Sequence, residues 1–318
     1  MSRTLPQRPS PYASRLERID SHAADVSVLG GVTRYWEYGD PNAKDTIILV
    51  HGFRGDHHGL DPFVAYLEGA RMISPDLPGF GLSTPLVDVG HDIDGYRQWL
   101  TAFIHALDLT GRVIVLGHSF GSIIVAASIA AENSPQVSGI VLVNPIAQPA
   151  LAGPRGVMTR LAVFYYRIAA LLPESWGFAL LRNRIIVRIM SITMAKTSDR
   201  TLRAWIHNQH DRYFSAFSDR SVVLDAFRAS VSHNVGEYAP HITVPTLLVA
   251  AERDDITPIE AQRRLVTLFP NAHLVEIPDV GHLIHYEKPA EAAAAINDFV
   301  SSALAQPPAP SPTDHTAA

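Results

Sequence analysis

A serine between two glycines is the strongest chemical signal in this sequence of 318 residues. Residues 117–121 read Gly-His-Ser-Phe-Gly, directly after a β-branched run at 113–116 and directly before a helical pattern. A serine exposed on a sharp strand-to-helix turn requires small residues two positions before and after it, because a side chain there would collide with the strand or the helix. Gly117 and Gly121 meet that requirement. The pattern therefore predicts Ser119 as a nucleophile on such a turn.

A serine nucleophile also needs a base and a group that orients the base. Residues 250–258 form an acidic loop after a predicted strand, and His282 follows the last predicted strand. Loops at the carboxyl ends of parallel strands lie at one edge of a sheet, so residues far apart in sequence can meet there. We therefore predict Asp254 as the orienting acid and His282 as the base. Asp255 and His285 are the adjacent alternatives.

The elements that must position these residues alternate along most of the chain. Short β-branched runs followed by longer helical patterns are typical of βαβ units and a mainly parallel sheet, so the fold class is α/β. Parallel strands are predicted at residues 46–50, 71–74, 113–116, 140–143, 246–249 and 273–277, and an antiparallel edge strand at 32–38. Helices are predicted at residues 60–67, 92–107, 119–132, 259–269 and 289–304.

The alternation breaks for roughly 100 residues in the middle of the chain. This segment is helical in pattern and rich in Arg, Met and aromatic residues, with prolines as stops. We predict a helical cap at 146–239, inserted between two parts of an α/β core at 23–145 and 240–305. A flexible N-terminal segment is predicted at 1–22. The Pro-rich polar end at 306–318 is predicted to be disordered.

Five motifs in order resemble the α/β-hydrolase superfamily, over roughly residues 25–145 and 240–304. They are His51-Gly52-Phe53-Arg54-Gly55, Asp-Leu-Pro-Gly-Phe-Gly-Leu-Ser at 76–83, the glycine-flanked serine at 117–121, Asp-x-Ile-x-Pro at 254–258 and Gly-His-x-x-x-x-Glu-Lys-Pro at 281–289. The resemblance implies an α/β-hydrolase fold, in which helices flank a mostly parallel eight-stranded sheet and a helical cap is inserted. It points to the serine-nucleophile branch, similar to esterases and meta-cleavage-product hydrolases.

The resemblance also implies roles for individual residues. Ser119 corresponds to the nucleophile, His282 to the general base and Asp254 to the orienting acid. The backbone N–H groups of Phe53 and Phe120 correspond to the oxyanion hole, which stabilises the negative charge of a tetrahedral intermediate. No metal or cofactor is expected.

The expected activity is hydrolysis of carboxylic esters of small to medium apolar acyl groups through an acyl-enzyme. Haloalkane dehalogenases and epoxide hydrolases of the superfamily have Asp where this chain has Ser119, which favours acyl transfer. Meta-cleavage C–C hydrolases have a serine and a cap but typically carry Trp after the catalytic His, whereas Leu283 follows His282 here. That activity and a cofactor-free perhydrolase are the enzyme alternatives. A ligand receptor or scaffold on the same fold is the non-enzyme alternative.

Composition excludes several other classes. The chain is 47% hydrophobic and 18% charged, which is ordinary for a globular protein. It has no Cys, which excludes disulfides, thiolate metal sites and a Cys nucleophile. A net charge of −5 argues against nucleic-acid binding. No apolar run resembles a secretion signal or approaches the roughly 20 residues of a membrane span, so we expect a cytoplasmic protein without a transmembrane segment.

A histidine and aspartate group follows the first glycine-rich motif. Asp56, His57 and His58 are adjacent, and Asp76 could join them as a metal ligand. No helical ligand spacing or supporting residues are visible, so we expect solvated loop residues and no metal.

The predicted cap is basic. Residues 146–235 contain 12 Lys or Arg and five Asp or Glu, a net charge of +7, and the rest of the chain therefore carries −12. An excess of arginine usually belongs to a face of the protein that is exposed to solvent. Alternatively, arginines such as Arg182, Arg184 and Arg188 steer anionic substrates or contact anionic surfaces peripherally.

Overall fold

The computed structural model describes residues 8–149 and 156–303 and centres on one eight-stranded sheet. The strand order is β1-β2-β4-β3-β5-β6-β7-β8. The strands are β1 (Ser21–Val28), β2 (Gly31–Tyr38), β3 (Asp45–Val50), β4 (Ala70–Pro75), β5 (Arg112–His118), β6 (Gly139–Val143), β7 (Thr246–Ala251) and β8 (Ala272–Ile277). β1 with β2 and β2 with β4 pair antiparallel, and the other five pairs are parallel. The predicted mostly parallel, eight-stranded sheet is confirmed.

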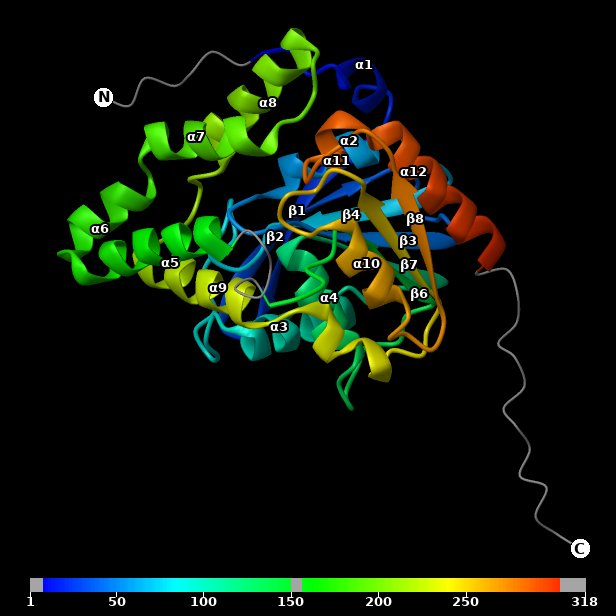
Figure 1. The fold of residues 1–318 in the computed structure, drawn as a ribbon. Helices are drawn as coiled ribbons and strands as arrows, with labels where there is room; N and C mark the ends of the chain where they lie inside the picture. The colour runs from blue at the N-terminus through cyan, green and yellow to red at the C-terminus, as the bar shows by residue number, and fades with distance from the viewer. Residues whose placement is uncertain (1–7, 150–155, 304–318) are drawn as a thin grey trace, which may run out of the picture.

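Helices cover both faces of the sheet (Figure 1). One face carries α2 (Asp61–Val64), α11 (Ile284–Glu287) and α12 (Pro289–Asp298), which continues into a π-helical turn, η4 (Phe299–Ala303). The other face carries α3 (Ile93–Ala106), α4 (Phe120–Ile129) and α10 (Ile259–Val266). Short 3-10 turns are η1 (His57–Gly59), η2 (Val235–Glu237) and η3 (Ala239–His241). No helix in the described part of the chain has the length and apolarity needed to cross a membrane.

The central strands are apolar along their whole length because helices bury both of their faces. On β3, Ile47 and Leu49 pack toward α2 and α12, whereas Ile48 and Val50 pack toward α3 and α4. Successive side chains of a strand point to opposite faces, so a strand covered on both sides reads as a continuous hydrophobic run. α4 is likewise buried at all of its residues, which fixes the helix that follows Ser119.

Within the described residues, five α-helices lie between β6 and β7, and we refer to them as the cap. They are α5 (Gly156–Leu171), α6 (Glu174–Leu181), α7 (Arg184–Met194), α8 (Arg200–Tyr213) and α9 (Arg220–Ser232). Figure 1 shows them together at one side of the sheet, in green and yellow. The structure thus has helices where the sequence predicts an inserted helical segment, and the boundaries at residues 146 and 239 stay a prediction.

The N-terminal region differs from its prediction as a flexible segment. From residue 8 onward it is described, and it forms α1 (Ala13–Leu16) before β1 begins at Ser21. The ring of Tyr12 is buried, and its hydroxyl donates to the carbonyl oxygen of Tyr286 at 2.5 Å. This tertiary contact carries no local sequence signal. Residues 1–7 and the predicted tail at 306–318 lie outside the described residues.

Candidate active site

Ser119 lies on the turn between β5 and α4 in a strained backbone conformation. Its φ of 54° and ψ of −117° fall outside the regions that L-residues prefer. A Cβ at Gly117 would lie 2.6 Å from the carbonyl oxygen of Gly121, and a Cβ at Gly121 would lie 2.3 Å from that of Val50. The two glycines therefore permit the close backbone packing that this turn requires.

The structure brings Ser119, His282 and Asp254 together at the carboxyl edge of the sheet. Nε2 of His282 lies 2.9 Å from Oγ of Ser119, and Nδ1 of His282 lies 2.7 Å from Oδ2 of Asp254. The three residues follow β5, β8 and β7 respectively. Such a chain of hydrogen bonds can take a proton from the serine hydroxyl and stabilise the imidazolium that results. The neighbouring Asp255 instead accepts from Nζ of Lys196 at 2.6 Å.

Asp254 is buried and is held by donors of its own loop. Its Oδ1 accepts from the backbone N–H groups of Ile256 and Thr257 at 2.7 and 3.1 Å, and its Oδ2 accepts from the hydroxyl of Thr257 at 2.6 Å. Burial raises the pKa of Asp254, but the adjacent His282 and these hydrogen bonds outweigh burial, so the pKa lies below its usual range. The carboxylate is therefore ionised at neutral pH and faces the imidazole.

Two further histidines lie beside His282 and are neutral. The ring of His118 is 4.2 Å from that of His285 and 5.4 Å from that of His282. Burial, reinforced by His282, lowers the pKa of His118 to about 3. Burial and the nearby His118 also hold the pKa of His285 well below its usual range. Of the three histidines, the structure places His282 against Ser119.

Asn144 connects the loops that carry the acid and the base. Its Nδ2 donates to the carbonyl oxygen of His282 at 2.9 Å, and its Oδ1 accepts from the backbone N–H of Ala251 at 2.8 Å. The side chain is fully buried, and its φ of 43° is left-handed. The sequence carries no signal for this role because both partners lie more than 100 positions along the chain.

The backbone N–H groups of Phe53 and Phe120 belong to loops next to the nucleophile. A Cβ at Gly52 would lie 3.3 Å from Cβ of Ser119, which shows how closely the first loop approaches. Neither N–H donates to another backbone or side-chain group among the described residues. Two amide donors beside a serine can stabilise the oxyanion of a tetrahedral intermediate.

A cavity of about 170 Å³ opens beside Ser119, between the core and the cap. Core loops and cap helices both contribute to its largely apolar wall, which includes Leu60, Leu283, Met190, Met194 and Phe214. A few polar groups in an apolar cavity are typical of sites that bind small organic molecules. The arrangement can therefore hold an apolar group with its reacting carbonyl at Ser119.

Arg54 is a buried cation that joins the loop of Phe53 to the cap. Its Nε donates to the carbonyl oxygen of Phe214 at 3.0 Å, and its Nη2 donates to that of Leu181 at 2.6 Å. Its Nη1 donates to the hydroxyl of Tyr166 at 3.0 Å. Arg54 is 1% exposed, with a left-handed φ of 64°. The sequence does not indicate this role, because a single arginine in a loop has no pattern that reveals its partners.

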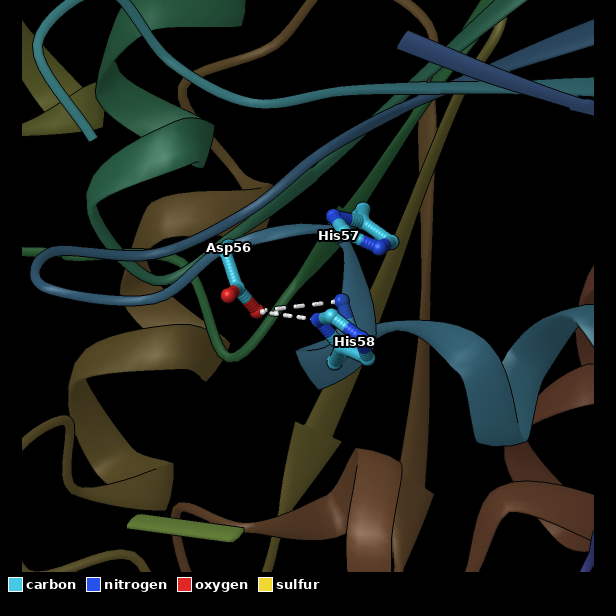
Figure 2. A group of neighbouring side chains, drawn as sticks. All are labelled: Asp56, His57 and His58. Atoms are coloured by element: carbon cyan, nitrogen blue, oxygen red, sulfur yellow. Dashed lines mark hydrogen bonds and ion pairs between the residues drawn. The ribbon is translucent and has the colours of Figure 1, made fainter. Parts of the chain in front are cut away.

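Asp56, His57 and His58 form the group that could suggest a metal site, and Figure 2 shows them together. Their candidate ligand atoms lie within 4.8 Å of one another. However, Nδ1 of His57 bonds Oδ1 of Asp76 at 2.8 Å, and Oδ1 of Asp56 bonds the backbone N–H and Nδ1 of His58. Because these hydrogen bonds join the three side chains to one another or to other groups of the protein, we interpret the group as structural. The expectation of solvated residues is wrong for Asp56 and His57, which are each 4% exposed.

Comparisons with known proteins establish the family. The model of the alpha/beta hydrolase family matches residues 47–295, so the chain belongs to this family and is an enzyme of the α/β-hydrolase class. Lipase 1 of Psychrobacter immobilis is 27% identical over 271 residues, which cover 83% of this chain and 79% of the lipase. Haloalkane dehalogenase 2 of Mycobacterium tuberculosis is 28% identical over 273 residues, which cover 81% of this chain and 89% of the dehalogenase. The structure of an esterase from Exiguobacterium antarcticum is similar with a TM-score of 0.72 and 18% identity, covering 88% of this chain and 100% of the esterase.

Proposed function

We propose that the chain is a serine hydrolase that cleaves carboxylic esters of small to medium, largely apolar acyl groups. The observation that carries this proposal is the 2.9 Å contact between Oγ of Ser119 and Nε2 of His282, with Asp254 on the far side of the ring. Similarity to a lipase and an esterase supports the ester class. A haloalkane dehalogenase is also similar to this chain, but the serine at position 119, bonded to His282, favours acyl transfer to a serine as the chemistry proposed.

The geometry supports a two-step reaction. Oγ of Ser119 attacks the carbonyl carbon while Nε2 of His282 takes the hydroxyl proton. The carbonyl oxygen becomes an oxyanion that accepts hydrogen bonds from the N–H groups of Phe53 and Phe120. The alcohol leaves with the proton from His282, and the acyl group stays on Ser119. A water molecule that gives its proton to His282 then attacks the acyl-enzyme; the bond to Oγ of Ser119 breaks, His282 returns the proton to Oγ, and the acid is released. Asp254, ionised, keeps the imidazole oriented throughout.

A panel of p-nitrophenyl esters of increasing acyl length tests the proposal. We expect Ser119→Ala to fold normally and to lose at least about a thousandfold in kcat, as removal of a triad serine does. The wild type should also react with a fluorophosphonate probe, and Ser119→Ala should not. Ser134→Ala, on an exposed serine outside the site, is the matched control and should keep both properties. Activity and labelling retained in Ser119→Ala would reject the proposal.

A further inference from the structure

The outer surface of the cap exposes large apolar side chains that the proposed reaction does not use. On α7, Ile185, Ile189 and Ile192 are 72%, 55% and 58% exposed. Their i, i+4, i+7 spacing places them on one face of the helix. Seven of the twelve exposed large hydrophobic residues of the described chain lie on α5, α6 and α7, the other four being Leu161, Phe164, Leu171 and Trp176. Such a concentration marks an interaction surface, whereas single exposed apolar residues are ordinary.

The same three helices are strongly basic. Residues 156–194 contain five arginines and a single acid, Glu174. Arg188 pairs with Asp211 of α8, and the exposed arginines are Arg160, Arg167, Arg182 and Arg184. Because residues 146–235 carry +7 and the rest of the chain carries −12, an anionic surface attracts the cap and repels the core.

The inner face of α7 belongs to the cavity beside Ser119. Met190 and Met194 line that cavity, and Val187 and Ser191 are buried. The isoleucines lie on the opposite face of the same helix, so one helix separates the cavity from the apolar outer surface. A molecule held at that surface is therefore one helix away from the proposed nucleophile.

We propose that the outer face of α5, α6 and α7 docks on a lipid bilayer that contains anionic headgroups, with α7 lying in the plane of the interface. A helix with an apolar face and flanking arginines buries the apolar side at the boundary between headgroups and acyl chains, while its arginines meet the lipid phosphates. The inference rests on the proposed ester hydrolysis and extends it, because the substrates are then esters that partition into the bilayer.

Cosedimentation with lipid vesicles tests the docking without any ester chemistry. The full chain carrying Ser119→Ala is mixed with vesicles of phosphatidylcholine alone, or with about one third phosphatidylglycerol. We expect binding to the anionic vesicles to be at least about tenfold stronger and to weaken as salt is added. Ile185→Ser combined with Ile189→Ser should weaken binding at least about tenfold. Arg184→Glu should weaken it about tenfold at low salt, and an acid is tolerated at this first residue of α7.

Matched controls lie on the core. Val87→Ser with Leu268→Ser removes two exposed apolar side chains, and Arg264→Glu reverses one exposed charge. These variants should bind vesicles like their parent. No binding by the parent, or equal losses in the controls, would overturn the docking proposal. A second result would also overturn it: the parent forms a dimer in sedimentation velocity, the double isoleucine variant is a monomer, and neither protein binds vesicles.

The docking proposal and the ester-hydrolase proposal fail separately. If the wild type hydrolyses soluble esters but does not bind vesicles, only the docking is rejected. If Ser119→Ala binds anionic vesicles but keeps wild-type ester hydrolysis, the docking stands and the assignment of the nucleophile is rejected.

Discussion

The guanidinium of Arg54 donates from Nη1 to the phenolic oxygen of Tyr166 at 3.0 Å, which joins the loop that carries Phe53 to the first helix of the cap. Carbonyl oxygens of Leu181 and Phe214 accept two further hydrogen bonds from it. A buried charge is costly unless its donors are satisfied, so the cap helps to hold this loop in place. Phe53, whose N–H we propose as an oxyanion donor, is one residue earlier on the same loop.

Replacing Arg54 should therefore impair both stability and turnover. Arg54→Met leaves buried carbonyl groups without donors, and we expect a loss of about 3 kcal/mol in the free energy of unfolding. Because the proposed oxyanion donor, the N–H of Phe53, would be less well positioned, kcat should fall at least about tenfold with a smaller change in KM. Tyr166→Phe removes one hydrogen bond and should cost about 1 kcal/mol. Urea unfolding and ester kinetics measure these effects. Wild-type stability and kcat in Arg54→Met would contradict the coupling.

The neighbouring acids Asp254 and Asp255 should differ sharply when replaced. Asp254 bonds the imidazole of His282, whereas Asp255 bonds Lys196 in an exposed ion pair. Asp254→Asn loses the charge that stabilises the imidazolium, and we expect kcat to fall by about 10³ to 10⁴. Asp255→Asn should stay within about threefold of the wild type, since exposed ion pairs contribute little. Kinetics on one p-nitrophenyl ester measures both variants. The opposite ranking would transfer the role to Asp255.

Local patterns in the sequence predict most of the sheet but miss β1. The other seven strands coincide with short, mostly apolar runs predicted as strands, and the structure has a strand at each of them. In β1, Ser21–Val28, only Val28 is buried. This edge strand is formed by its antiparallel pairing with β2, and edge positions do not require a hydrophobic run.

In the candidate site, too, residues in local motifs are predictable from the sequence, whereas residues that depend on distant partners are not. The sequence predicts Ser119, Asp254 and His282 because each lies in a recognisable motif of a loop or turn that follows a strand, and the structure brings them within hydrogen-bond distance. Arg54 and Asn144 were not predicted, because their roles depend on partners far along the chain. Such contacts depend on how whole helices, strands and loops pack together, so the residues next to them in sequence show no pattern that predicts them.

The Asp56, His57 and His58 group yields a prediction about metals. Nδ1 of His57 and Oδ1 of Asp56 are occupied by hydrogen bonds within the protein. We therefore expect dialysis against a chelator to leave ester hydrolysis and the unfolding temperature unchanged. Loss of activity on chelation, with recovery on addition of Zn²⁺ alone, would show that the group binds a metal.

The glycine at the end of the nucleophile turn should not tolerate a methyl group. A Cβ at Gly121 would lie 2.3 Å from the carbonyl oxygen of Val50 and 2.7 Å from that of His51. These are backbone atoms of the central sheet and its loop, and they cannot move aside cheaply. We expect Gly121→Ala to lower the free energy of unfolding by about 3 kcal/mol or more. Gly90→Ala, whose Cβ would have no neighbour closer than 3.9 Å, is the control and should change it by less than about 1 kcal/mol. Equal unfolding midpoints in urea would contradict the packing argument.

Buried histidines should make the protein sensitive to mild acid. Burial is the main cause that lowers the pKa values of His118 and His210 to about 3, compared with about 6.5 in the unfolded chain. Between pH 3 and pH 6.5 the unfolded state binds more protons than the folded state. The contribution of these histidines to the free energy of unfolding is therefore fully present above pH 6.5 and is lost as the pH falls toward 3. Each histidine should remove on the order of 2 kcal/mol between pH 7 and pH 5. His210→Gln should reduce this loss by its own share, on the order of 2 kcal/mol, whereas His273→Gln, on an exposed histidine, should not change it. Urea unfolding at the two pH values measures the difference, and equal free energies of unfolding in the wild type would refute the prediction.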